Sequence, residues 1–164
     1  MATENKKLSQ VDLSQFKFML TKKIAIIQSE WNDEITGALT EGAKNTLVQA
    51  GVKANNVKVY KVPGSFELPL GAKLILDKEE DLDAVICVGC IIRGETSHFD
   101  FVAQGVTYGV QKLNLQYGKP VVFCVLTDNT IEQSRARSGG SHGNKGVEAA
   151  ATALKMIQLK DNLK

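Results

Sequence analysis

The run Ala84–Ile92, AVICVGCII, constrains the fold more than any other part of the chain. All of its residues are apolar or glycine, and charged or polar residues stand on both sides of it. A strand that is buried on both faces has this composition, and it is typical of the centre of a parallel sheet covered by helices on both sides. The polar stretch Arg93–His98 follows the run, and apolar residues then return at helical spacing.

The same order, a β-rich apolar run and then a helical pattern, occurs four times along the chain. This order predicts right-handed crossovers and a three-layer α/β/α sandwich, flavodoxin-like, with a four-stranded parallel sheet and helices on both faces. The strands are expected at 22–28, 57–62, 84–92 and 120–126, and the helices at 32–50, from 67, 97–117, from 130 and 145–159. Asn32 is the expected N-cap of the first helix, and Leu70 and Leu74 are expected to face inward from the second.

The remaining segments predict less regular structure. Residues 138–146, SGGSHGNKG, indicate a glycine-rich loop between the last two helices. We expect a single domain over residues 1–164 with an N-terminal extension at 1–20. Within that extension the segment VDLSQF, residues 11–16, is a candidate edge strand on this chain or on a neighbouring one.

Composition excludes several classes of function. With 164 residues, 43% of them hydrophobic, the chain can build one globular core. The net charge of +2 does not indicate a nucleic-acid surface. The start, MATENKK, has no apolar signal region, and no window is apolar over a membrane-spanning length, so we expect a cytoplasmic protein with no membrane contact.

The spacing Cys87-x-x-Cys90 resembles a redox or metal-binding pair, but it lies inside the predicted central strand. Residues three apart on a strand point to opposite faces, so these thiols cannot hold one metal or form a bridge. A zinc site would also need a second Cys or His pair, which the sequence does not offer. We therefore expect buried, reduced cysteines, Cys124 included, and no metal site.

Ligands of open parallel sheets bind outside the carboxyl ends of the strands, so the residues that follow each strand are the candidate site. Trp31 follows the first strand and could stack on a planar ligand, or pack on its own helix start. Ser65 and Glu67 follow the second and offer polar groups, although both also suit a helix start. After the third strand comes a helix start able to bind anions, with His98 in its first turn as a candidate proton carrier or a plain surface residue. After the fourth, Arg137 could hold a phosphate or be a solvated cation at a helix end.

Taken together, these rim residues suit a planar polar molecule that meets a phosphorylated small molecule. Apart from Trp31, they lie within longer motifs: VPGSFELPL at 62–70, GCIIRGETSHFDFV at 89–102 and VVFCVLTDNTIEQSRAR at 121–137, and a fourth motif, GNKGVEAA, follows at 143–150. In this order the motifs resemble the 6,7-dimethyl-8-ribityllumazine synthase family, the penultimate enzymes of riboflavin synthesis. The resemblance covers roughly residues 22–159.

The resemblance implies a transferase reaction. The amine of 5-amino-6-(D-ribitylamino)uracil condenses with 3,4-dihydroxy-2-butanone 4-phosphate to give 6,7-dimethyl-8-ribityllumazine, with release of phosphate and water. It implies no metal and no organic cofactor. It further implies pentamers with sites between subunits, of which twelve build an icosahedral shell in some relatives. We expect the shell here because the loop at 138–144 is compact, and riboflavin synthase is a candidate partner.

The resemblance also assigns roles to individual residues. His98 matches the proton-transfer residue, and Arg137 matches the phosphate-binding arginine. The positions matching the pyrimidine and ribityl subsite are Trp31, Ser65, Phe66, Glu67, Cys90, Ile91, Ile92, Phe123 and Lys145. Phe123 is the aromatic residue that a neighbouring subunit presents, and Glu148 forms a further polar pair with Lys145.

Glu95 and Thr96 match the pair beside the butanone phosphate. Relatives often have a small residue at the position of Glu95, so this carboxylate departs from the pattern and is expected to point outward.

Two other functions remain open on the sequence alone. A flavodoxin-like FMN carrier would need a Ser-, Thr- or Gly-rich loop after the first strand, whereas here that loop reads SEWNDE and would repel a phosphate. A family member without catalysis, acting as a cage, would not need His98 and Arg137. The sequence favours the enzyme over both.

Overall fold

The sheet of the computed structural model, which describes residues 11–16 and 19–163, contains the four predicted parallel strands. They are β1 (Ile24–Ser29), β2 (Val57–Val62), β3 (Ala84–Ile92) and β4 (Val121–Asp128), in the order β2-β1-β3-β4. The chain moves to one side of β1 to build β2 and to the other side to build β3 and β4. Because crossovers are right-handed, this reversal distributes the helices over both faces of the sheet.

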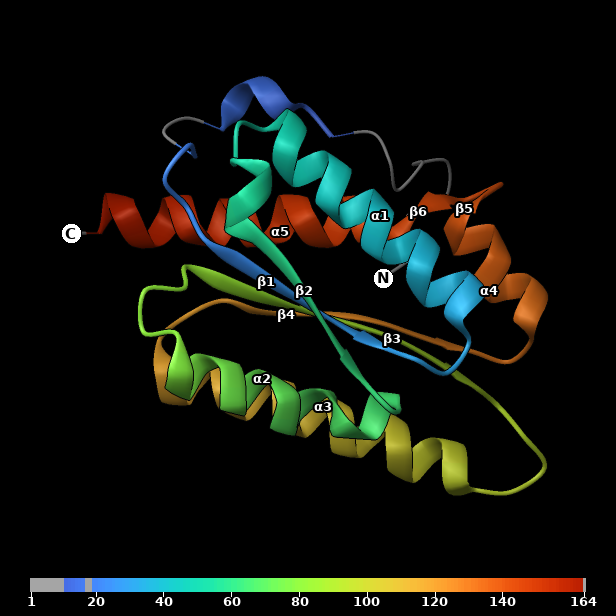
Figure 1. Ribbon diagram of the computed structural model, residues 1–164. Helices are drawn as coiled ribbons and strands as arrows, with labels where there is room; N and C mark the ends of the chain where they lie inside the picture. Colours follow the sequence, from blue (N-terminus) through green and yellow to red (C-terminus); the bar gives the residue numbers. More distant parts are fainter. Residues whose placement is uncertain (1–10, 17–18, 164) are drawn as a thin grey trace.

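The helices form the two outer layers that the sequence predicted (Figure 1). Helices α1 (Asp33–Gln49) and α5 (Lys145–Asn162) cover one face, and α2 (Leu68–Lys78) and α3 (His98–Tyr117) cover the other. The short helix α4 (Ile131–Arg137) follows β4. Short 3₁₀ turns, η1 (Leu13–Gln15), η2 (Ala54–Asn56) and η3 (Ser65–Glu67), complete the connections.

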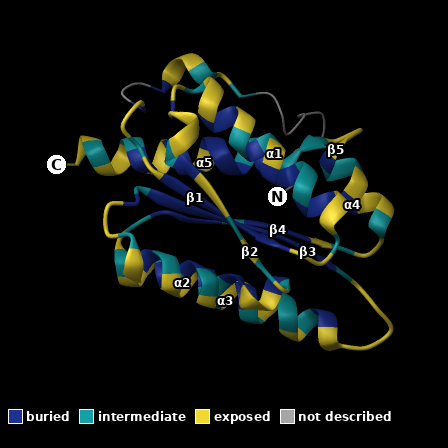
Figure 2. Cartoon of the chain, in the orientation of Figure 1, coloured by how far each residue is buried: buried dark blue, intermediate teal, exposed yellow. Residues whose placement is uncertain are grey.

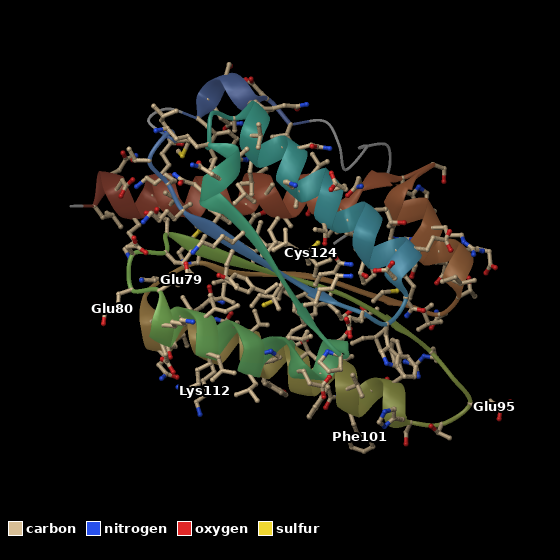
Figure 3. The ribbon with its side chains drawn as sticks, viewed as in Figure 1. Glu79, Glu80, Glu95, Phe101, Lys112 and Cys124 are labelled. Carbon is tan, nitrogen blue, oxygen red and sulfur yellow. The ribbon has the colours of Figure 1, made fainter. Side chains whose placement is uncertain are left out.

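The core consists of two apolar clusters, one on each face of the sheet. Strands β1, β3 and most of β4 are buried, whereas the edge strand β2 is largely exposed or half-buried (Figure 2). Residues of β3 alternate between the clusters, so Cys87 packs toward α2 and α3, whereas Cys90 packs toward α1 and α5. The two thiols thus lie on opposite faces, as their spacing predicted. Cys124 lies in the same cluster as Cys90 and is also buried (Figure 3).

The prediction that Leu70 and Leu74 face inward is wrong, since they are 59% and 60% exposed. The buried stripe of α2 is instead Leu68, Ala72 and Leu76. A position two residues along a helix is turned by about 200°, so a stripe that starts at Leu68 leaves the other two leucines on the opposite side.

Two further segments differ from expectation. Residues 11–16 form no strand in this chain, because Asp12 caps the 3₁₀ turn η1 by accepting from the backbone N–H of Ser14 (2.9 Å). The glycine-rich segment is not an irregular loop, since β5 (Ser138–Gly140) and β6 (Gly143–Asn144) pair as a short antiparallel hairpin. This compact hairpin joins α4 directly to α5.

Candidate active site

The carboxyl ends of the four strands lie at one end of the sheet, where α1 and α3 also begin (Figure 1). Backbone and side-chain hydrogen bonds tie the loops at this end to one another. The loop after β1 is held by that after β2 through Trp31 N–H to the carbonyl of Pro63 (3.3 Å) and Glu30 N–H to that of Val62 (2.9 Å).

The same loop is held on its other side by β3. The amide nitrogen Nδ2 of Asn32 donates to the backbone carbonyl of Cys90 at 3.2 Å. The loop after β3 is in turn tied to the end of β4 by Arg93 N–H, which donates to the carbonyl of Asp128 (3.0 Å). The four loops are therefore joined pairwise in the order of the strands, and they form one continuous rim.

Asn32 contributes to this rim in a way that differs from the prediction. Its φ of 58° and ψ of 47° place it in the left-handed region, and its side chain makes no capping bond to α1. Asparagine tolerates this region better than most residues. Asn32 thus occupies the predicted N-cap position of α1, but its side-chain amide points across the rim to β3 and does not bond the helix start.

The predicted aromatic plate, Trp31, lies on the rim with 74% of its surface exposed. Beside it, in η3 after β2, Phe66 is exposed at 59% and Ser65 is buried. The ring of Phe66 lies against α3, since a Cβ on Gly105 would come within 2.8 Å of it. The Ser65 hydroxyl lies against Gly89 of β3 in the same way, since a Cβ on Gly89 would come within 2.6 Å of the Ser65 oxygen.

At the end of β3, Ile91 is buried on the α2 and α3 side of the sheet, and Ile92 is half-buried on the α1 and α5 side. The residues that follow, 93–98, are all exposed (Figure 2). Within this loop the N–H of His98 faces the hydroxyl of Thr96 at 3.4 Å. Glu95 lies at the outer tip of this loop and points away from the molecule (Figure 3).

Arg137 is the last residue of α4 and lies next to the end of β4. Its Nη1 donates to the carbonyl of Gln133 (3.0 Å), and its Nε lies 3.9 Å from Oδ1 of Asp128. The Asp128 carboxylate also accepts from the buried hydroxyl of Ser134 (2.8 Å), which the thiol of Cys90 faces at 3.4 Å. Nη2 of Arg137 has no partner among the residues that the structure describes, so one edge of the guanidinium is open.

Three predicted residues lie away from the loops of this rim. Phe123 pairs with Cys87 in the parallel register, in the interior of β4, and its ring packs on the α2 and α3 side. Lys145 and Glu148 form an ion pair (2.6 Å) in the first turn of α5. Burial raises the pKa of the Cys124 thiol to about 12, and the charges of Lys145 and Glu148 shift this pKa in opposite directions.

Sequence reasoning missed the role of Arg93. Its guanidinium forms a two-pronged ion pair with Asp100 in the first turn of α3, and it also bonds the side chain of Asn129 after β4. The hydrogen bond from Arg93 lowers the pKa of the Asp100 carboxyl. The only signal of this role in the sequence was a pair of opposite charges, Arg93 and Asp100, seven residues apart on either side of a turn. Among the described residues, no cluster of three or more His, Cys, Asp or Glu could hold a metal ion.

Comparison with known proteins decides the family. Residues 21–161 match the model of the 6,7-dimethyl-8-ribityllumazine synthase family. The chain belongs to this family. Proteins named 6,7-dimethyl-8-ribityllumazine synthase from Christiangramia forsetii, Flavobacterium johnsoniae and Parabacteroides distasonis are 52%, 51% and 50% identical to it. The alignments cover 100%, 98% and 96% of this chain and 98%, 84% and 98% of those relatives.

Membership of the lumazine synthase family confirms the resemblance drawn from the four motifs. It agrees with the flavodoxin-like sandwich that the structure shows. No helix in the described part of this family member is long and apolar enough to cross a membrane.

Proposed function

We propose that this chain condenses 5-amino-6-(D-ribitylamino)uracil with 3,4-dihydroxy-2-butanone 4-phosphate to give 6,7-dimethyl-8-ribityllumazine. The observation that carries the proposal is the joined rim, on which an exposed indole, an exposed loop before a helix start and an arginine with an open edge are fixed relative to one another. Family membership supplies the identity of the substrates.

The rim offers a subsite for each substrate. The pyrimidine would stack on Trp31, with Ile91, Ile92 and the backbone of Cys90 as the floor of the subsite. The ribityl chain would extend toward Ser65, Phe66 and Glu67.

The butanone phosphate would lie between the backbone of Glu95 and Thr96 and the open edge of Arg137. An arginine edge and the N–H groups of a helix start are both good donors to a phosphate. Holding the two substrates together removes much of the entropic barrier to their reaction.

The chemistry follows from this placement. The primary amine attacks the ketone, water leaves and an imine forms. Phosphate is then eliminated, and ring closure with loss of a second water completes the lumazine. His98 would carry protons in these steps, a role worth about 10²–10⁴-fold in rate. Arg137 would stabilise the charge that develops on the departing phosphate.

A subunit alone would not complete this site if Phe123 serves as the family resemblance implies. Phe123 lies in β4, an edge strand of the sheet, and is only partly buried there, which leaves part of its ring available to a neighbouring subunit. We therefore propose a pentamer with Phe123 contributed across the interface, and twelve pentamers in a shell. The compact hairpin between α4 and α5 supports the shell. Light scattering that finds a lone pentamer would reject the shell, and a monomer would reject both assemblies.

The direct test is an absorbance assay for lumazine formation from the two substrates. The proposal predicts product only when both substrates are present, together with one equivalent of phosphate. A protein that binds the lumazine or riboflavin but forms no product would instead be a non-catalytic cage. We also propose a cytoplasmic location and riboflavin synthase as a partner, which co-purification from the native cells would test.

A further inference from the structure

Arg93 is the first residue after β3, and it makes more polar contacts than any residue proposed to bind substrate. Nη2 donates to Oδ1 of Asp100 at 2.7 Å and Nη1 donates to Oδ2 at 3.2 Å. Nε donates to Oδ1 of Asn129 at 3.2 Å. All three nitrogens of the guanidinium are thus engaged by two side chains from different parts of the rim.

The planar group also rests on an aromatic ring. Its central carbon lies 4.2 Å from the centre of the Phe99 ring, and Phe99 is itself 9% exposed and anchored in the core. Stacking on a fixed ring and two-pronged pairing with a carboxylate both suit arginine and not lysine. The orientation of Arg93 is therefore set by the core.

The segment that these contacts enclose is the one that the proposed reaction needs. Residues 94–97 are exposed, and His98 stands between them and the paired Asp100. Apart from the Thr96 contact, the described bonds at this point are those from Asp100 and Phe101 N–H to the carbonyl of Ser97. The pair Arg93–Asp100 closes the loop at its two ends.

The third contact reaches the loop after β4, which leads into α4. Asn129, which accepts from Arg93, donates its own N–H to Oε1 of Gln133 in α4 (2.8 Å). The carbonyl of Gln133 in turn accepts from Nη1 of Arg137 (3.0 Å). Arg93 consequently links the loop of His98 to the helix that carries Arg137.

We propose that Arg93 is a positioning residue, which with Asp100 and Asn129 holds the loop at 94–98, and with it His98 and the proposed phosphate-binding backbone, in a fixed place beside the loop after β4. This inference rests on the proposed function of the rim. Arg93 does not itself bind the phosphate, because its nitrogens already have acceptors and its charge is balanced by Asp100.

The first experiment separates positioning from direct binding. Arg93→Met and Asp100→Asn each break the same pair, so positioning predicts a similar loss in both: kcat lower by about tenfold, a raised KM for the butanone phosphate and an unchanged KM for the pyrimidine. The double variant should lose no more than either single one, since the two residues act as a unit. If Asp100→Asn instead keeps or improves inhibition by inorganic phosphate while Arg93→Met abolishes it, Arg93 is a phosphate ligand and the proposal is wrong.

The second experiment asks whether the fork geometry is needed. Arg93→Lys keeps the cation but cannot bridge Asp100 and Asn129 with parallel bonds, so its kcat should lie between those of Arg93→Met and the unchanged protein. Full activity in Arg93→Lys would overturn the proposal. Hydrogen exchange of the amides at 94–98 should become faster in all three variants, while the urea midpoint stays within the range of a matched control. An unchanged exchange rate would also count against it.

Lys23→Met provides that control, because Lys23 forms an ion pair of similar exposure with Asp81 at the opposite end of the sheet. It should retain normal kinetics. If the unchanged protein forms no lumazine, the proposed function fails; if it does and the Arg93 and Asp100 variants match it, the positioning role alone fails.

Discussion

The side-chain amide of Asn32 donates to the backbone carbonyl of Cys90, 58 residues away in the sequence, at 3.2 Å. This bond bridges β1 and β3, the neighbouring strands on either side of the point where the chain reverses its direction across the sheet. Ligands of open α/β sheets bind at such a reversal. Asn32 directly follows Trp31, so this bond holds the loop of Trp31 against the floor of the proposed pyrimidine subsite.

Replacing Asn32 by alanine should destabilise the fold by about 1–2 kcal/mol, because an alanine at φ 58° is strained and the bond to Cys90 is lost. Asn32→Gly should lose less unfolding free energy than Asn32→Ala, because glycine adopts this backbone conformation without strain. Urea unfolding measures both values. Equal stability of the two variants would show that strain contributes nothing. Both should raise the KM for the pyrimidine, since each frees the loop of Trp31.

Gly146 permits the close approach of α5 to α1, since a Cβ there would overlap the backbone carbonyl of Leu39. Backbone cannot move aside as a flexible side chain can, so Gly146→Ala should cost about 3 kcal/mol or more in unfolding free energy. Gly37→Ala is the matched control, because open space surrounds that position in α1. It should raise stability by about 0.5–1 kcal/mol. A Gly146→Ala protein as stable as the original would contradict the close packing of these helices.

The layers of the fold follow from the sequence because burial repeats with the period of each element. The stripe Ile35, Leu39, Ala43 and Leu47 is buried as predicted, and β3 occupies the range that its apolar run indicated. In α2 the periodicity was ambiguous, since Leu68, Leu70, Leu74 and Leu76 include two possible stripes. The packing of the whole chain decides between them, and no local signal does.

The site was predictable to a different extent. That the rim lies after the strands follows from topology, so Trp31 and His98 could be placed there from the sequence. The roles of Asn32 and Arg93 depend on partners that come close only in the folded chain. The local preference for capping therefore predicted the N-cap position of Asn32 but not the bond of its side chain to β3, and only the opposite charges seven residues apart pointed to the role of Arg93.

The buried thiols should be unreactive in the folded protein. Burial raises the pKa of Cys87 and of Cys124 to about 12, and it also raises the pKa of Cys90. The thiolate is the reactive form, so alkylation at pH 8 should be slow for all three until urea unfolds the chain. Mass spectrometry counts the modified thiols. Rapid labelling of Cys87 in the native state would contradict its complete burial.

His98→Ala should lower kcat and leave measurable activity, because the substrates remain positioned when the proton carrier is lost. The loss should not exceed the 10²–10⁴-fold that such groups contribute. The KM for the butanone phosphate should change little. His142 is the other histidine and lies exposed at the turn of the hairpin, so His142→Ala serves as the control with normal kinetics. Equal losses in the two variants would remove His98 from the mechanism.

Arg137→Ala should act on binding of the phosphate substrate. Hydrogen bonds to charged groups contribute about 1.5–3 kcal/mol, so the KM for the butanone phosphate should rise by about tenfold or more, and inhibition by inorganic phosphate should weaken in parallel. Arg135 lies in the same helix but pairs with Glu34 of α1 through two bonds of 3.0 Å. Arg135→Ala therefore removes an equal charge two residues away and should leave both constants nearly unchanged. If the two variants behave alike, the effect is one of net charge at the rim, and Arg137 has no specific contact with the phosphate.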